Sequence, residues 1–322
     1  MTLSPKTLPG IMCAVTLALL PGSWQYAQHY GDLVWLQTGL CISFALLMES
    51  LCLHLKRRSF SELGNLSWLV CGLLLARALP LLTPAWLLAL ASMGAIMIAK
   101  YGCGGLGKNR LNPVLVGLGL VSLCFYQLLP AGIAAAADWT RSLSIEQALS
   151  LQLRFSAAVP ADMASGATSL VTDQLSQPMA MNQWSGYLFG GLALALLNVI
   201  RLEIPLMMLT STLLTGIALG LSPQESLHNL TMGGMIFAAF FIATDPVTSP
   251  DSRIGRLLFA ATAGALTELV RMYGLYADGL CFAILAANLL VPQFDQLARR
   301  LNQPWYRRAG NNHHFKPRRQ PG

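Results

Sequence analysis

Five residues in one polar segment of the chain have types and spacing that could carry chemistry: Asp162, Ser165, Gly166, Ala167 and Thr168. Gly166 and Ala167 add almost no side-chain bulk, so the hydroxyl group of Thr168 stays accessible to a modifying enzyme or another large partner. Asp162 and Ser165 supply further polar groups beside it. Small residues next to Ser and Thr are also usual in surface loops. The pattern by itself therefore leaves both a modification site and an ordinary loop open.

Four charged residues lie inside long apolar blocks: Glu49, Arg77, Glu268 and Arg271. A charge at the centre of a bilayer costs about 2.5 to 3.5 kcal/mol on insertion scales, so each of these residues needs compensation. Glu268 and Arg271 are three residues apart on one helix face and can neutralise each other. Glu49 lies close enough to the end of its block to approach water. The alternative for these residues is an ion path through the membrane.

Asp245 and Asp278 stand at the ends of apolar blocks, beside Pro246 and Gly279. Freed backbone carbonyl groups at such positions can join a carboxylate in holding a cation. The alternative is a helix cap, and for Asp278 an N-cap before the last apolar block explains the residue fully. The seven cysteines include no CxxC pair, so they indicate neither a metal site nor a disulfide framework.

The composition indicates the medium in which these residues work. Of the 322 residues, 54% are hydrophobic and only 11% are charged, whereas a soluble domain has roughly 25% charged residues. This excludes a soluble globular enzyme. The net charge of +7 does not indicate nucleic acid binding, because the basic residues sit between apolar blocks and not on one polar face. We expect a polytopic membrane protein in the lipid bilayer, with no nucleic acid partner.

The apolar blocks set the expected fold class, which is all-α. A helix needs about 20 apolar residues to cross the hydrocarbon. On that rule we expect about ten transmembrane helices, at residues 8–26, 33–55, 66–82, 85–99, 111–129, 184–200, 204–221, 227–244, 257–273 and 279–291. The third, fourth and tenth of these blocks are short.

The distribution of Lys and Arg predicts the topology. Most of the 21 basic residues fall in segments that share one side if both termini are cytoplasmic. We expect a first membrane half at 1–130, an exported loop at 131–183, a second membrane half at 184–293 and a basic cytoplasmic tail at 294–322. Within the loop, Ser144 is a candidate N-cap for a short amphipathic helix.

Two halves of five spans each must enter the membrane in opposite directions, which is the inverted-repeat plan. Pro80 interrupts the third span, and Gly233 and Gly234 interrupt the eighth. An irregular helix therefore falls third in each half. Gly and Pro are also common in ordinary membrane helices, so the two interruptions can be explained without an inverted repeat.

Several stretches of the chain match a known family. Residues 162–168 fit the pattern D-x-x-[ST]-G-A-T, at which a flavin transferase esterifies the phosphate of FMN to the final threonine. Three further matches are K-Y-G-C-G-G-L-G-K-N at 100–109 with N-P at 112–113, T-D-P-V-T at 244–248, and Y-A-D-G at 276–279 with A-N-L-L-V-P at 287–292. Over nearly its full length the chain resembles the D component of the Rnf-type electron transport complex (ferredoxin:NAD oxidoreductase), which is related to the B component of the sodium-translocating NADH:quinone reductase.

The resemblance implies a redox subunit of the bacterial inner membrane that carries covalent FMN on Thr168. It also implies electron transfer within a multisubunit complex, coupled to movement of sodium ions or protons, with a flavin transferase needed for maturation. A noncovalent riboflavin is a further expectation, with Asp245 and Asp278 as candidates for an ion or second-flavin site. Such a subunit is not a complete enzyme alone. The alternative is an inverted-repeat channel or carrier without a redox role, which would have no use for a flavin acceptor at Thr168.

Overall fold

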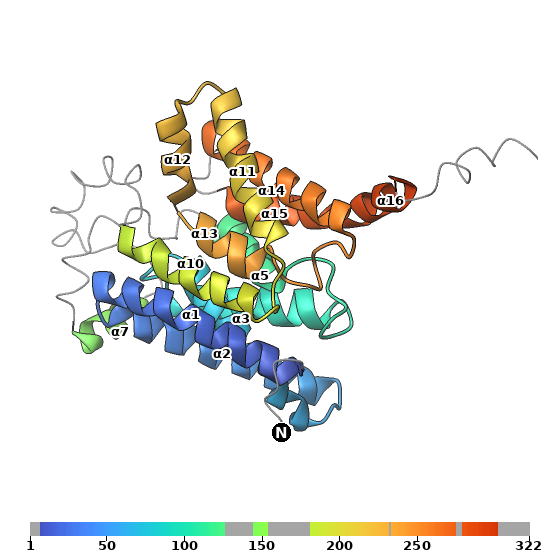
Figure 1. Ribbon diagram of the computed structural model, residues 1–322. Coiled ribbons are helices and arrows are strands. Elements are labelled where there is room, and N and C mark those ends of the chain that lie inside the picture. The colour runs from blue at the N-terminus through green and yellow to red at the C-terminus, as the bar shows by residue number, and fades with distance from the viewer. Residues whose placement is uncertain (1–6, 126–143, 154–180, 232, 275–278, 302–322) are drawn as a thin grey trace, which may run out of the picture.

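The computed structural model describes residues 7–125, 144–153, 181–231, 233–274 and 279–301, and every regular element in these ranges is a helix (Figure 1). The all-α prediction is confirmed for this part of the chain. The first half contains α1 (Leu8–Tyr30), α2 (Leu33–Leu55), the 3-10 helix η1 (Phe60–Asn65), α3 (Ser67–Ala78), α4 (Ala85–Met93), the π-helix η2 (Gly94–Tyr101) and α5 (Pro113–Phe125).

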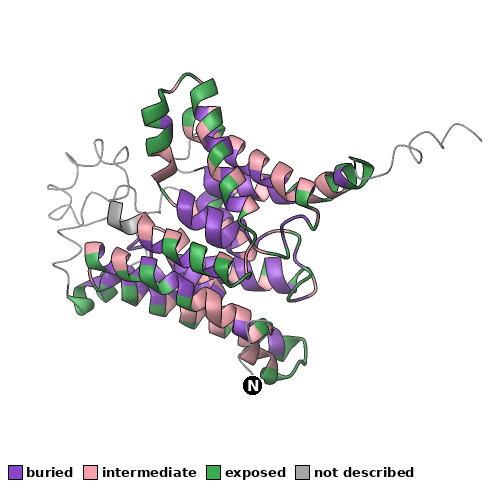
Figure 2. Ribbon diagram, in the orientation of Figure 1, coloured by how far each residue is buried: buried purple, intermediate pink, exposed green. Residues whose placement is uncertain are grey.

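The remaining helices belong to the loop and to the second half. They are α7 (Ile145–Gln152), α10 (Met181–Leu196), α11 (Glu203–Ala218), α12 (Pro223–Thr231), α13 (Met235–Phe237), the π-helix η5 (Ala238–Ile242), α14 (Arg253–Tyr273), α15 (Leu280–Leu289) and α16 (Val291–Leu301). Buried side chains from both halves form one apolar cluster, to which α1, α4, η5 and α14 contribute Leu19, Leu88, Phe240 and Phe259. Figure 2 shows this buried interior where the two sets of helices meet.

Two of the described helices, α1 and α2, are each long and apolar enough to cross a membrane. A third span results if α15 and α16, which meet at a bend of 52°, are counted together. Other apolar helices, among them α3, α5, α10 and α11, have 10–17 residues. The structure therefore shows an apolar helical bundle, and the predicted number of ten spans stays a prediction.

The predicted break in the third span is present. Helix α3 ends at Ala78, the chain passes through Pro80 and through Leu82 at a φ of 61°, and α4 begins at Ala85. A helix end leaves carbonyl groups without partners. The fully buried side-chain amide of Gln37 on α2 is the partner of these carbonyl groups. Its Nε2 lies within hydrogen-bond distance, 3.1–3.3 Å, of the carbonyl oxygens of Ala76, Leu79 and Pro80. A side chain of a neighbouring helix thus stabilises the break.

The predicted break in the eighth span is also present. Helix α12 ends at Thr231, Gly233 adopts a φ of 57°, and α13 begins at Met235. Both irregular regions then continue into a π-helix, η2 in the first half and η5 in the second. Wide helical turns of this kind are rare and are often found at functional sites.

Helices α1 and α10 join the two halves through a very close contact. A Cβ atom at Gly190 of α10 would overlap the carbonyl oxygen of Ala18 on α1, and one at Gly186 would lie 2.7 Å from the backbone of Gly22. Gly186 and Gly190 form a G-x-x-x-G motif, which lets two membrane helices approach with their backbones in contact.

Helix α7 confirms the amphipathic helix that was predicted within the loop. The Ser144 hydroxyl accepts a hydrogen bond from the backbone N–H of Gln147, and the Gln147 side chain accepts one from the N–H of Ser144, which is a reciprocal capping box. Ala148 packs in a small apolar cluster with Tyr30 and Val34. This part of the loop is therefore anchored at the end of α2 that lies opposite Lys56, Arg57 and Arg58.

Candidate functional site

The residues of the predicted flavin site, Asp162, Ser165, Gly166, Ala167 and Thr168, lie outside the described residues, and so does Asp278. The structure describes Asp245, the glycine-rich loop and the charged residues within the helices.

A buried junction brings together three of the stretches that carry the family resemblance. The Nδ2 of Asn112 donates to the carbonyl oxygen of Ile242, at the end of η5, over 3.1 Å. The Oδ1 of Asn288 on α15 accepts from the backbone N–H of Asn112 at 3.2 Å, and its Nδ2 donates to the carbonyl oxygen of Thr248 at 3.0 Å. Asn112, Asn288 and Thr248 are all buried. Two loops from opposite halves are thereby fixed to each other by two asparagine side chains.

Asp245 stands at the edge of this junction and is half-buried. Its carboxylate accepts hydrogen bonds from the backbone N–H of Val247 (3.3 Å) and from the hydroxyl of Thr248 (3.0 Å). Burial raises the pKa of the Asp245 carboxyl above its usual value, and the two hydrogen bonds partly oppose that rise. Asp245 is thus a carboxylate held in place by its own loop, next to the exposed residues Pro246 and Val247.

The glycine-rich loop after η2 turns as its glycines allow. Gly104, Gly105 and Gly107 have φ values of 111°, 108° and 81°, which side-chain-bearing residues rarely adopt. The N–H of Gly105 donates to the carbonyl oxygen of Lys100 at 2.9 Å. These three glycines therefore permit a tight turn directly after η2.

Glu49 is wholly buried, so the prediction that it approaches water is wrong. Its carboxylate binds the ammonium group of Lys100, which donates to Oε1 at 2.6 Å and to Oε2 at 2.7 Å. Lys100 also donates to the Ser67 hydroxyl at 2.6 Å, and the Tyr101 hydroxyl donates to Glu49 at 2.9 Å. Glu49 is buried with a partner because Lys100 lies within the π-helix η2, which places it inside the bundle. The position of Lys100 in the sequence is typical of a cytoplasmic loop.

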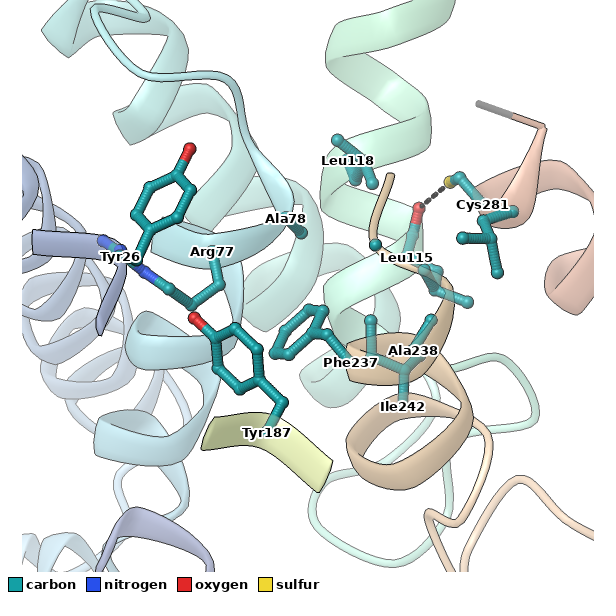
Figure 3. Close-up of a pocket in the computed structure, with 12 residues that line it drawn as sticks. Tyr26, Arg77, Ala78, Leu115, Leu118, Tyr187, Phe237, Ala238, Ile242 and Cys281 are labelled. Carbon is teal, nitrogen blue, oxygen red and sulfur yellow. Dashed lines mark hydrogen bonds between the residues drawn. The ribbon is translucent and has the colours of Figure 1, made fainter. Parts of the chain in front are cut away.

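A cavity of about 120 Å³ lies between the two halves. Helices α1, α3, α10 and α13 line it with Tyr26, Arg77, Tyr187 and Phe237 (Figure 3). Figure 3 shows the hydroxyl end of Tyr187 next to the Arg77 side chain. The cavity therefore combines aromatic walls with one cationic group.

Arg77 faces the interior of the bundle. Its Nη2 donates to the Thr38 hydroxyl at 2.7 Å and to the carbonyl oxygen of Val34 at 3.2 Å. The guanidinium carbon lies 5.0 Å from the centre of the Tyr26 ring, which is within the range of a cation–π interaction. The hydrogen bonds of Nη2 and the aromatic ring thus compensate part of the guanidinium, whereas its buried Nε and Nη1 have no hydrogen-bond partner among the described residues.

Glu268 and Arg271 do not form the simple pair that their spacing predicts. The ion pairs among the described residues involve Glu49, Glu62 and Glu203, and not Glu268. Both residues instead contact Asn229 of α12, whose Nδ2 donates to Glu268 at 2.7 Å and whose backbone oxygen accepts from Arg271 at 2.8 Å. Asn229 of α12 thus contacts both side chains in place of a direct ion pair between them.

Sequence reasoning missed several residues that organise these sites. Gln37, Ser67 and Tyr187 contact their partners across 33 or more residues of chain, and no local pattern indicates such contacts. Lys100 carried a weak signal, because it directly follows an apolar block without a polar residue before it.

Comparison with known proteins identifies relatives across almost the whole chain. A sequence model of the NQR2, RnfD, RnfE family matches residues 2–303. Proteins named as the D component of an ion-translocating oxidoreductase complex, from Pectobacterium atrosepticum and Stutzerimonas stutzeri, are each 36% identical to this chain. The first match covers 88% of this chain and 91% of the relative, and the second covers 90% of both. A protein of the same name from Vibrio cholerae is 32% identical, over 91% of this chain and 94% of its own.

Proposed function

The chain belongs to the NQR2, RnfD, RnfE family, and on that premise we propose that it is the D-type redox component of an ion-translocating oxidoreductase complex. In this proposal it carries FMN through a phosphoester on Thr168 and passes electrons to and from other subunits. Electron transfer is coupled to movement of sodium ions or protons across the bacterial inner membrane. A flavin transferase attaches the FMN.

One observation carries this function: a chain of this family contains Asp162, Ser165, Gly166, Ala167 and Thr168 in the D-x-x-[ST]-G-A-T pattern. The threonine hydroxyl supplies the oxygen of the phosphoester, and its two small neighbours leave room for the transferase. FMN bound there would supply one- and two-electron chemistry, while the protein fixes its position. Helix α7 supports the proposal, because it anchors the same loop to α1 and α2 through Ala148.

The proposed membrane arrangement is ten helices in two inverted halves, with both termini cytoplasmic and residues 131–183 exported. The paired breaks support it, because each half has a short helix, an interruption and then a π-helix in the same order. The basic residues Lys56, Arg57 and Arg58 follow α2 at the end opposite to the α7 contact, which agrees with an exported loop.

The structure offers two candidate positions for a noncovalent riboflavin, the cavity at Arg77 and the carboxylate of Asp245, and they differ in how well they fit that ligand. The cavity at Arg77, of about 120 Å³, is smaller than the roughly 300–1,000 Å³ of pockets that hold compounds of that size. Riboflavin therefore does not fit the cavity as it stands. The carboxylate of Asp245 is half-buried beside two exposed residues and fits an ion or a flavin hydroxyl better. We assign Asp245 to that role, with Asp278 as its proposed companion.

The flavin linkage is tested by denaturing electrophoresis of the full chain after co-expression with a flavin transferase. Under ultraviolet light we expect a fluorescent band from the wild type and from Ser165→Ala, and none from Thr168→Val. Equal membrane insertion of the variants is the control. Undiminished fluorescence in Thr168→Val would show that FMN is attached to a residue other than Thr168. Absence of fluorescence from the wild type would contradict the redox function and favour the channel or carrier.

A further inference from the structure

Helix α7 carries a stripe of exposed apolar side chains. Three of them recur every four residues and therefore lie on one face of the helix: Ile145, Leu149 and Leu153. Their exposed fractions are 61%, 37% and 63%. The exposed polar side chains of Glu146 and Ser150 lie on a different face. A helix with one apolar and one polar exposed face is typical of the boundary between lipid and water.

The buried face of α7 fixes the position of the helix on the bundle. Ala148 packs with Tyr30 and Val34, where α1 ends and α2 begins. One turn later, the Nε2 of Gln152 donates to the Oε1 of Gln37 at 3.3 Å, and both side chains are fully buried. Figure 1 shows α7 at this end of α1 and α2. Helix α7 is therefore attached beside the first turns of α2.

The length of α2 places this attachment at one boundary of the hydrocarbon layer. Gln37 precedes Lys56 by 19 residues, which corresponds to about 28 Å along a helix that rises 1.5 Å per residue. The hydrocarbon layer is roughly 30 Å thick. Because the Lys and Arg distribution puts Lys56 at the cytoplasmic boundary, Gln37 lies close to the opposite one.

Two tryptophan side chains mark the same boundary independently of charge. Trp24 of α1 and Trp35 of α2 are both exposed, and their ring centroids lie 6.3 Å apart. Trp35 is only two residues from Gln37. Tryptophan is enriched where a membrane protein passes from lipid to water, because its ring is apolar and its N–H is polar.

We propose that α7 lies in the outer interface of the membrane and inserts Ile145, Leu149 and Leu153 among the acyl chains of the lipid. The helix contains Glu146 and no Lys or Arg, so burial of the apolar stripe, and not attraction to anionic headgroups, binds it to the lipid. The contact holds the start of the exported loop at the membrane surface. The inference rests on the membrane arrangement proposed above and not on the flavin linkage, which the fluorescence of the denatured chain tests separately.

Spin labelling of the full chain in phosphatidylcholine nanodiscs tests the inference. Cys103→Ala and Cys124→Ala first remove the exposed native cysteines found among the described residues. A nitroxide is then attached to Leu149→Cys or, as the matched control on the polar face, to Ser150→Cys. Oxygen concentrates in the hydrocarbon and a nickel chelate stays in water. We expect the ratio of collisions with oxygen to collisions with the chelate to be several-fold higher at residue 149 than at residue 150.

Leu153→Cys should give the same high ratio as Leu149→Cys, and it replaces that variant if either fails to fold. Addition of phosphatidylglycerol should leave the ratios unchanged, because α7 has no basic residue. Ratios at 149 and 153 no higher than at 150 would overturn the inference, since the stripe would then face water. Few collisions with both reagents at 149 and 153 would also overturn it, since protein and not lipid would then cover the stripe.

Discussion

Lys100 and Glu49 are 51 residues apart in sequence, and the ammonium group of one binds both carboxylate oxygens of the other in the protein interior. The ammonium group has three N–H donors, and its third acceptor is the hydroxyl of Ser67. This contact ties α2, α3 and the end of η2 together. It also explains how two opposite charges are tolerated where both side chains are buried.

Removal of one member of this pair should destabilise the fold strongly. Glu49→Gln leaves the Lys100 charge buried, and such a loss costs about 3–5 kcal/mol. We expect the double variant Glu49→Gln/Lys100→Met to be destabilised less than the two single variants combined. Thermal unfolding of the four proteins in detergent measures this. Strict additivity would show that the two side chains do not stabilise each other.

Arg77→Lys should be destabilising although it keeps the charge. An ammonium group cannot keep the planar contacts of the guanidinium with Thr38, Val34 and the Tyr26 ring. Hydrogen bonds to charged groups contribute about 1.5–3 kcal/mol each, so we expect a loss of that order. Unfolding temperatures measure it, with Arg58→Lys as the control, because Arg58 is exposed and its ion pair with Glu62 spans 3.5 Å. A smaller effect at Arg77 than at Arg58 would contradict the prediction.

Asp245→Asn should stabilise the protein at neutral pH. Because the pKa of Asp245 is raised in the folded state, the neutral form is favoured by folding. Its contribution is complete below the unfolded pKa of about 3.9 and is lost as pH rises through the folded value. The unfolding temperature of Asp245→Asn should therefore exceed that of the wild type by an amount that increases as pH rises from about 4 toward 7. Unfolding temperatures across this range test it.

The exposed Asp251→Asn is the control for that experiment, because it removes a carboxylate without removing a burial cost. If this difference in unfolding temperature decreases with rising pH, the two hydrogen bonds from Val247 and Thr248 have a larger effect on the pKa of Asp245 than burial has.

The topology should place both ends of the chain in the cytoplasm. The expectation follows from the Lys and Arg distribution, with Lys56, Arg57 and Arg58 on the inner side of α2. Reporter tags at either terminus should be protected from an external protease, and a tag next to Trp139 should be cleaved. Termini on opposite sides of the membrane would contradict both the ten-span arrangement and the inverted repeat.

Local features of the sequence predicted local features of the structure. Pro80 and Gly233 marked the two helix breaks, and Ser144 marked the start of α7, because backbone geometry and capping depend on near neighbours. Helix length was predicted poorly. Leu79, Leu81 and Leu82 are apolar and buried yet lie outside any helix, since hydropathy reports the surroundings of a residue and not its backbone conformation.

Contacts between distant segments were not predictable in this way. Asn112 and Asn288 are 176 residues apart, and only the three-dimensional structure shows that they meet. The same holds for Glu268, where the spacing to Arg271 indicated a pair and both side chains instead contact Asn229 of α12.

The close contact of α1 with α10 limits how the two halves can move. Carriers that alternate between inward and outward access rock one half against the other, and such motion needs an interface whose side chains can slide. Here Gly190 meets the backbone of Ala18 directly, so even a small relative shift would drive backbone atoms into each other or open a void. Sliding of α10 along α1 would therefore require the two helices to separate first.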